Sequence, residues 1–206
     1  LAQFQKEVTV EDVLKSVMIS PPLQLLDCSG ITDGAAGVIL VPADDAKKYT
    51  DTPMYVVGSG QANIGNAVGN LANLTEWVPL KVAAQEAFES AHMKADDVDV
   101  AELHDCFTIS EIMEYEAFGW CEKGKGGKFI ADGQPYIGGK VAVNPRGGLL
   151  GCGHPLGATA ILQALDILRQ FRGEVPKGRL VEGAEVALAH NLSGPANVHS
   201  IMVYSR

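Results

Sequence analysis

Residues 98–107 read VDVAELHDCF, a stretch in which apolar and polar residues alternate before a histidine, an aspartate and a cysteine follow in a row. Alternation with a period of two predicts a strand over residues 98–103. A helix is expected to follow over residues 108–118. Strand ends and helix starts are where an α/β fold builds its reaction sites. The imidazole of His104 and the thiol of Cys106 are therefore candidate catalytic groups.

Residues 153–160, GHPLGATA, form a second candidate segment because they open a strongly apolar helix predicted over residues 158–172. His154 would lie beside unpaired backbone N–H groups and the positive end of the helix dipole. Such a field favours the neutral imidazole, which can take a proton from a thiol. A purely structural histidine in a helix-start turn is the alternative interpretation.

Side chains two apart in an extended segment share a face, so His104 and Cys106 would point into one pocket with Asp105 on the opposite side. There the imidazole could donate a hydrogen bond to a substrate oxygen, and the thiol could shuttle a proton. The competing interpretation is a buried cysteine that acts as a small apolar side chain. The HxC and CxH spacings lack the paired-ligand pattern of zinc sites, so no metal is expected.

The polar segment 190–195, HNLSGP, lies between the last two predicted strands and contains Asn191 and Gly194. Its side chains could line the same pocket. A plain hairpin turn is an equally good interpretation of this segment.

The composition is that of a soluble globular protein: of 206 residues, 47% are hydrophobic and 20% charged. The net charge of −9 argues against a nucleic-acid or anionic-membrane surface as the main partner. No apolar stretch approaches the length of a membrane span. The four cysteines form no CxxC pair, which favours reduced thiols and a cytoplasmic location. No signal peptide is visible, and because the chain begins at Leu1 without Met, we expect its natural N-terminus to lie upstream.

Predicted strands alternate with predicted helices along the chain, which indicates the α/β class. The expected strands are 23–26, 35–41, 54–59, 98–103, 141–143, 185–189 and 198–204. The expected helices are 10–18, 44–49, 78–92, 108–118 and 158–172. Residues 61–73 and 119–139 are expected to be loops, and residues 144–153 a tight glycine-rich turn.

Three segments together resemble the motifs of one enzyme family, the thiolases. Residues 144–160, NPRGGLLGCGHPLGATA, resemble the thiolase GHP motif, and residues 28–36, CSGITDGAA, resemble the SGxxDGAA segment. Residues 104–107 are similar to the HDCF motif of the sterol-carrier-protein-2-type thiolases and their archaeal and bacterial relatives. The motifs stand in the family's order, and the resemblance covers essentially the whole chain.

The resemblance implies a fold of two similar βαβαβαββ halves, which form five α-β-α-β-α layers, together with a loop domain. Residues 1–52 would then be the end of the loop domain and the last strands of the N-terminal half. Residues 53–206 would form the C-terminal domain.

The resemblance also implies roles for individual residues. His154 would activate a nucleophilic cysteine and help to hold the thioester oxygen, and His104 would donate to the enolate oxygen of the second acyl group. Cys106 would be the acid/base that handles the α-proton. Ser29 would lie near the pantetheine arm of CoA, and Gly194 would match a glycine-rich turn that supplies a backbone N–H.

Two departures from the family pattern bear on the chemistry. The family's nucleophilic cysteine lies in the N-terminal half, upstream of Leu1, and none of the four cysteines present takes its role. The last family motif usually reads HNxGxGG, whereas residues 193–196 here read SGPA. Pro195 removes a backbone donor from this turn.

The activity implied by the resemblance is that of an acyl-CoA C-acyltransferase in lipid or aromatic acyl-CoA metabolism. It would cleave a 3-oxoacyl-CoA with CoA or run the reverse Claisen condensation, with CoA as a substrate and no metal or redox cofactor. A homodimer or higher oligomer is expected, and HDCF-type relatives also suggest a small zinc-ribbon/OB-fold partner protein. The alternatives are a thiolase-fold aldol lyase that acts on a CoA ester and a non-catalytic thiolase-like subunit.

Overall fold

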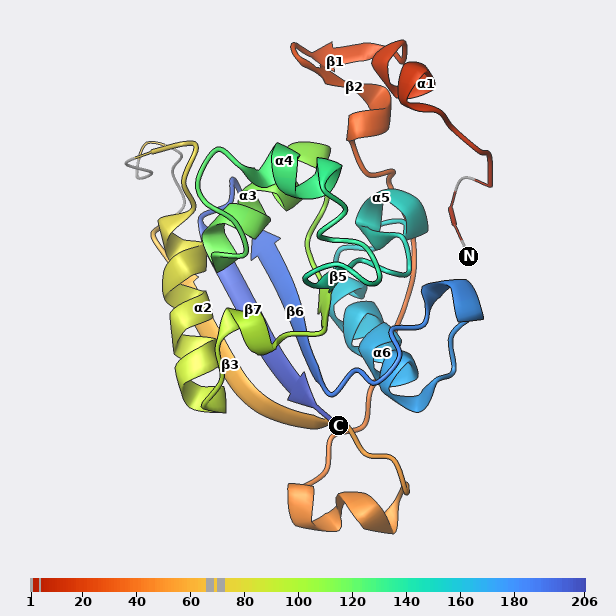
Figure 1. The fold of residues 1–206 in the computed structure, drawn as a ribbon, viewed down its shortest axis with the longest axis vertical. Helices are drawn as coiled ribbons and strands as arrows, with labels where there is room; N and C mark the ends of the chain where they lie inside the picture. Colours follow the sequence, from red (N-terminus) through yellow and green to blue (C-terminus); the bar gives the residue numbers. More distant parts are fainter. Residues whose placement is uncertain (1, 4, 66–68, 70–72) are drawn as a thin grey trace.

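A computed structural model describes residues 2–3, 5–65, 69 and 73–206 and shows a mixed five-stranded sheet with helices on both faces (Figure 1). The strands stand in the order β3-β7-β6-β4-β5. Their bounds are β3 Tyr55–Asn63, β4 Val100–Glu102, β5 Ala142–Val143, β6 Val186–Ser193 and β7 Val198–Ser205.

The direction of the strands determines which loops meet at one edge of the sheet. β3, β7 and β6 pair antiparallel, whereas β6, β4 and β5 pair parallel. The carboxyl ends of the parallel strands therefore lie at the same edge, where open α/β sheets place their ligands. The HDCF residues 104–107 follow shortly after β4. Asn191 lies near the carboxyl end of β6, where it pairs with Ser200 of β7.

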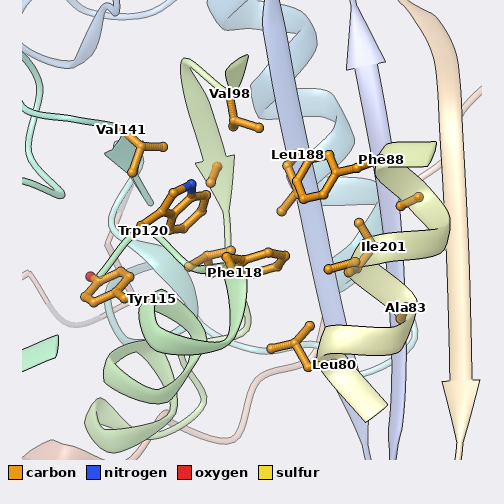
Figure 2. Packing of buried hydrophobic residues seen from close by; sticks show 14 of the residues in the cluster. Leu80, Ala83, Phe88, Val98, Tyr115, Phe118, Trp120, Val141, Leu188 and Ile201 are labelled. Atoms are coloured by element: carbon orange, nitrogen blue, oxygen red, sulfur yellow. The ribbon is translucent and has the colours of Figure 1, made fainter. Parts of the chain in front are cut away.

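Side chains from the two faces of the sheet enter two separate cores. One core joins α2 (Val78–Ala91) and α3 (Thr108–Phe118) to one face, and Figure 2 shows Leu80 and Phe118 packed with Leu188 and Ile201. The other core joins α6 (Thr159–Arg172) to strand residues whose side chains point the other way, among them Val100. Burial on both faces explains why the strands are so apolar.

Helix α2 lies unusually close to the edge strand β3. A Cβ at Gly58 would come within 2.3 Å of the Ala87 carbonyl oxygen, and one at Gly60 within 2.0 Å of the Ala83 carbonyl oxygen. Only glycine fits at these two positions, because the obstacle is backbone and cannot move aside.

The remaining elements are short and surround the sheet. Near the N-terminus, β1 and β2 form an antiparallel hairpin beside α1 (Figure 1). The bounds are α1 Val10–Leu14, β1 Met18–Ser20, β2 Leu23–Gln24, α4 Gly126–Ala131 and α5 Gly148–Cys152, with 3-10 turns η1 Leu25–Asp27, η2 Ala43–Lys48, η4 Ala95–Asp97 and η5 Lys177–Arg179. Among the described residues, no helix combines the length and apolarity needed to cross a membrane.

The α/β class and the long helices agree with the expectations from sequence, because α2, α3 and α6 begin and end within a residue of the predicted ranges. The strand predicted for residues 35–41 is wrong. That segment is extended without strand pairing, and Ile39 and Leu40 are 89% and 78% exposed. A continuous apolar run becomes a buried strand only where other strands pair with it and helices cover it, and no described residue does so here.

Other expectations fail near glycines and at the ends of elements. The predicted tight turn 144–153 contains α5, and the predicted strand 23–26 is only β2, followed by η1. The predicted helix 10–18 is only α1, which ends at Leu14, and β1 begins at Met18. The predicted loop 119–139 contains α4, whose first backbone N–H donates to the Glu116 carboxylate at 3.1 Å. The predicted loop 61–73 begins inside β3, and its residues 66–68 and 70–72 lie outside the described residues.

Candidate active site

A surface cavity of about 490 Å3 lies where two of the sequence motifs meet. Ile31 and His154 form an isolated parallel bridge, and Cys28 and Phe107 form an antiparallel one. These bridges bring the segments 28–34, 104–107 and 153–157 together, although they are far apart in sequence. The cavity is lined by Ser29, Gly30, Ile31, Thr32, Asp33, Gly34, His154, Pro155, Leu156 and Gly157.

His154 is held by contacts on both its backbone and its ring. Its backbone N–H donates to Thr32 Oγ1 at 3.0 Å, and its Nδ1 lies 2.7 Å from Thr159 Oγ1. The Thr159 hydroxyl also lies 3.1 Å from the Pro155 carbonyl, and when it donates its only hydrogen to that carbonyl it accepts from His154 Nδ1–H. The neutral ring then keeps a lone pair at Nε2, and burial lowers the pKa of His154 below its ordinary 6.5. This histidine is therefore a proton acceptor at neutral pH.

His104 lies directly beside His154, with ring centroids 4.8 Å apart and planes at 89°. Its Nδ1 is 3.0 Å from the Asn191 side-chain oxygen. Burial lowers the pKa of His104 to about 4, so this imidazole is also neutral at pH 7. The structure thus brings together three of the residues that the sequence selected.

Cys106 and Ser29 meet through the backbone rather than through their side chains. The Ser29 N–H donates to the Cys106 carbonyl at 2.9 Å, and the Cys106 sulfur lies 4.0 Å from Ser110 Oγ. Burial raises the pKa of the Cys106 thiol to about 11. The thiol is therefore protonated at neutral pH, which suits a group that gives a proton and does not suit a nucleophile.

Asp105 connects the HDCF segment to the segment of His154. Its carboxylate accepts the backbone N–H of Leu149 at 2.7 Å, in the first turn of α5, and α5 ends at Cys152, followed by Gly153 and then His154. Burial raises the pKa of Asp105 to about 7. Sequence patterns alone gave Asp105 no functional role. In the structure its carboxylate anchors the first turn of α5.

Gly194 lies in the turn between β6 and β7 with a positive φ of 61°, where the nearest side chain is that of Asn197. The structure does not bring it to the cavity-lining residues. Its part in a reaction stays a prediction from the resemblance.

A fully buried chain of three titratable groups lies beneath the two catalytic candidates. His190 Nδ1 is 3.0 Å from Glu114 Oε1, His190 Nε2 is 2.9 Å from His199 Nδ1, and His199 Nε2 is 2.9 Å from the Ala196 carbonyl oxygen. A carbonyl only accepts, so His199 Nε2 carries a hydrogen. Burial lowers the pKa of both histidines to about 3, so each ring holds one hydrogen. The order of donors then leaves His190 Nδ1 without a hydrogen.

Glu114 must therefore be the donor at the head of this chain. A carboxylate at Glu114 would instead place an oxygen 3.0 Å from the bare His190 Nδ1, with no hydrogen between the two atoms. Burial raises the pKa of Glu114 well above its ordinary value, which keeps it protonated. With a neutral Glu114, each group donates to the next along the chain: Glu114 to His190, His190 to His199, and His199 to the Ala196 carbonyl. Ala196 lies in the turn that contains Gly194.

This assignment predicts how Glu114 tolerates replacement. Glu114→Gln supplies an N–H donor of the same size, so we expect the free energy of unfolding to change by less than about 1 kcal/mol. Glu114→Ala leaves a buried acceptor without a partner and a cavity, at a cost of about 2–4 kcal/mol. Urea unfolding of both variants measures the difference. Equal losses in the two variants would indicate an ionised Glu114 paired with a charged His190.

The sequence interpretation missed Thr32, Thr159 and Gln163, which hold the two histidines in place. The sequence did contain a signal for two of them, because Thr159 and Gln163 are four residues apart in a helix whose other residues are mostly apolar. In the structure both side chains are buried. Polar residues at helical spacing on a buried face have to find partners. Within the described part of the chain, no group of three or more His, Cys, Asp or Glu side chains is arranged to hold a metal ion.

The chain is similar in sequence to known proteins. A model of the family described as Thiolase C-terminal domain-like matches residues 60–206. Acetyl-CoA acetyltransferase of Methanothermobacter thermautotrophicus is 48% identical over 205 residues, which are 100% of this chain and 53% of that protein. Sterol carrier protein 2 of Oryctolagus cuniculus is 39% identical over 196 residues, which are 93% of this chain and 36% of that protein. The chain thus spans about half the length, or less, of these curated relatives.

A solved structure named Ltp2-ChsH2(DUF35) aldolase has a similar fold. The TM-score is 0.84, and the match covers 98% of this chain and 52% of that one. Because the sequences are only 23% identical, this likeness concerns the fold alone.

Proposed function

The chain belongs to the Thiolase C-terminal domain-like family, as its motifs predicted, and from this premise we propose that it is part of an acyl-CoA C-acyltransferase. The reaction is the thiolytic cleavage of a 3-oxoacyl-CoA or the reverse Claisen condensation. A cysteine upstream of Leu1 supplies the nucleophile, and this chain supplies the groups that move protons. Because that cysteine carries the acyl group, the proposed reaction uses CoA as a substrate and needs no metal or redox cofactor.

The observation that carries the proposal is the contact of two neutral imidazoles beside one cavity. His154 keeps its Nε2 lone pair and can take the proton of a thiol that attacks a thioester. The Cys106 thiol, protonated at neutral pH, can return a proton to the carbanion formed when the carbon–carbon bond breaks. Ser29 lines the same cavity and would lie near the pantetheine arm.

A thiolase-fold aldol lyase is the second candidate, and the turn at residues 193–196 favours it. Pro195 has no N–H, so this turn offers one donor fewer to an oxyanion than a turn of glycines. The fold neighbour named as an aldolase is consistent with this candidate. A lyase would cleave a 3-hydroxyacyl-CoA without acyl transfer to a cysteine.

The test is the intact mass of the natural polypeptide that contains these residues, measured after incubation with acetyl-CoA. An acyltransferase gains one acetyl group, and the group leaves when CoA is added. Release of an aldehyde or ketone from a 3-hydroxyacyl-CoA with no adduct would support the lyase. If neither occurs, and if the protein still binds acyl-CoA, the chain belongs to a non-catalytic subunit.

We also propose that the protein works as an oligomer, either a homodimer or a complex with a small zinc-ribbon/OB-fold protein. The two-part name of the fold neighbour supports a partner protein. Light scattering on the natively purified protein distinguishes the two assemblies by mass.

A further inference from the structure

Gln163 has its amide orientation fixed by two backbone groups. It is fully buried on α6, and its Nε2 donates to the carbonyl oxygens of Leu103 at 3.1 Å and His190 at 3.3 Å. Carbonyl oxygens cannot act as donors, so the amide cannot be reversed without losing both bonds. Its Oε1 must therefore point the other way, where it accepts from the Asn191 side-chain N–H.

This orientation determines the next two groups in turn. Because Asn191 uses Nδ2 to donate to Gln163, its Oδ1 is the atom that lies 3.0 Å from His104 Nδ1. An amide oxygen only accepts, so His104 Nδ1 must carry a hydrogen. A neutral imidazole has one N–H, and Nε2 is then bare.

We propose that Gln163 is a positioning residue that orients the Asn191 amide and thereby holds His104 as the Nδ1–H tautomer, with an unprotonated Nε2. The orientation is relayed from two backbone carbonyls, one at the end of β4 and one in β6, so the sheet itself sets the tautomer. His154 reaches the same tautomer by a separate route through Thr159. The two neighbouring rings therefore both present Nε2 as an acceptor.

This inference rests on the proposed function and refines it. In the resting protein, His104 offers Nε2 as an acceptor and must first gain a proton there before it can donate to an enolate oxygen. Gln163 thereby determines that the resting site offers an acceptor, and not a donor, at this position.

The test is nitrogen-15 NMR of the histidine rings in the natural polypeptide, at pH 7 and without substrate. The His104 signals are assigned by their loss in His104→Gln. We expect the hydrogen on Nδ1 in the unsubstituted protein. Gln163→Met removes both bonds to the carbonyls and frees the Asn191 amide, so a second His104 species with Nε2–H should appear. Because the His104 ring is then no longer held in one orientation, kcat/KM should fall by up to about 100-fold.

Gln170→Met is the matched control, because Gln170 is buried two turns further along α6 and bonds to the backbone of Arg179 and Val181, away from the histidines. It should leave the His104 tautomer and kcat/KM unchanged. If Gln163→Met does not fold, Asn191→Asp and Asn191→Leu replace it: the first retains an acceptor and the Nδ1–H tautomer, and the second releases it. Hydrogen on Nε2 in the unsubstituted protein, or the absence of an Nε2–H species in Gln163→Met and in Asn191→Leu, overturns the inference.

The NMR measurement needs no turnover, so the two proposals can fail separately. A correct tautomer in a protein without acyl transfer rejects the acyltransferase and leaves the role of Gln163 standing. An active acyltransferase with hydrogen on His104 Nε2 does the reverse.

Discussion

His154→Asn is expected to lower kcat for acyl transfer by about 100- to 10,000-fold, the range over which a positioned acid or base contributes. Asn can still donate a hydrogen bond, but it cannot take a proton from a thiol. With His154 Nδ1–H donating to Thr159, the ring has Nε2 as its free acceptor. The loss should therefore appear in kcat, with only a small change in KM.

The pH dependence of the unsubstituted protein tests the same role. Burial lowers the pKa of His154 below 6.5, so the basic form is present above that lowered pKa and is lost as pH falls through it. We expect kcat/KM to decline on the acid side at a pH below 6.5. A decline centred above 6.5, or one that persists in His154→Asn, would assign the base to another group.

His92→Asn is the matched control for this substitution. His92 ends α2 in a left-handed conformation with φ of 54°, which Asn adopts readily, and it lies outside the candidate site. Its replacement should leave both kcat and the pH profile unchanged. A similar loss of activity in both variants would mean that His154→Asn acts through the fold.

The candidate site could be predicted from sequence in so far as its residues stand at the ends of regular elements. His104 follows an alternating strand and His154 precedes an apolar helix, so local patterns alone selected both. What the sequence does not contain is the relay of hydrogen bonds that orients His104. Gln163 matters because of two carbonyls that are 60 and 27 residues away, and only the folded sheet brings these carbonyls to one side chain.

The errors in the fold have the opposite cause, because local patterns were trusted where tertiary context decides. Residues 35–41 are as apolar as β6, but β6 has a strand on each side and the other segment has none among the described residues. In α6, too, tertiary context decides which side chains are buried. Its sheet-facing side buries Gln163 and Gln170, while Leu162 and Leu165 remain partly exposed. Apolar periodicity locates the helix correctly but does not tell which side faces this sheet.

Gly148→Ala is expected to destabilise the protein strongly. A Cβ at Gly148 would come within 2.1 Å of Asp105 Oδ2, and the residue has a φ of 61°. Overpacking costs about 1–3 kcal/mol and the left-handed conformation about 1–2 kcal/mol more, so the free energy of unfolding should fall by about 2–5 kcal/mol. Because Asp105 anchors α5 just before His154, activity should also fall in the fraction that remains folded.

The control for this substitution lies in the same helix. A Cβ at Gly151 meets nothing within 4 Å and the residue has no positive φ, so Gly151→Ala should change the free energy of unfolding by less than about 0.5 kcal/mol. Thermal or urea unfolding compares the two variants directly. An equal loss in both would show that α5 rejects any side chain, independent of Asp105.

A double-mutant cycle separates the steric conflict from the backbone strain. Asp105→Ala alone leaves the Leu149 N–H without its acceptor, at a cost of about 1–3 kcal/mol. Once Asp105 is gone, Gly148→Ala no longer meets a carboxylate, and only the left-handed backbone penalty remains. The double variant should therefore be more stable than the sum of the two single losses predicts, by about 1–3 kcal/mol. Strict additivity would mean that Asp105 moves aside freely, and that it does not hold the α5 backbone which leads to His154.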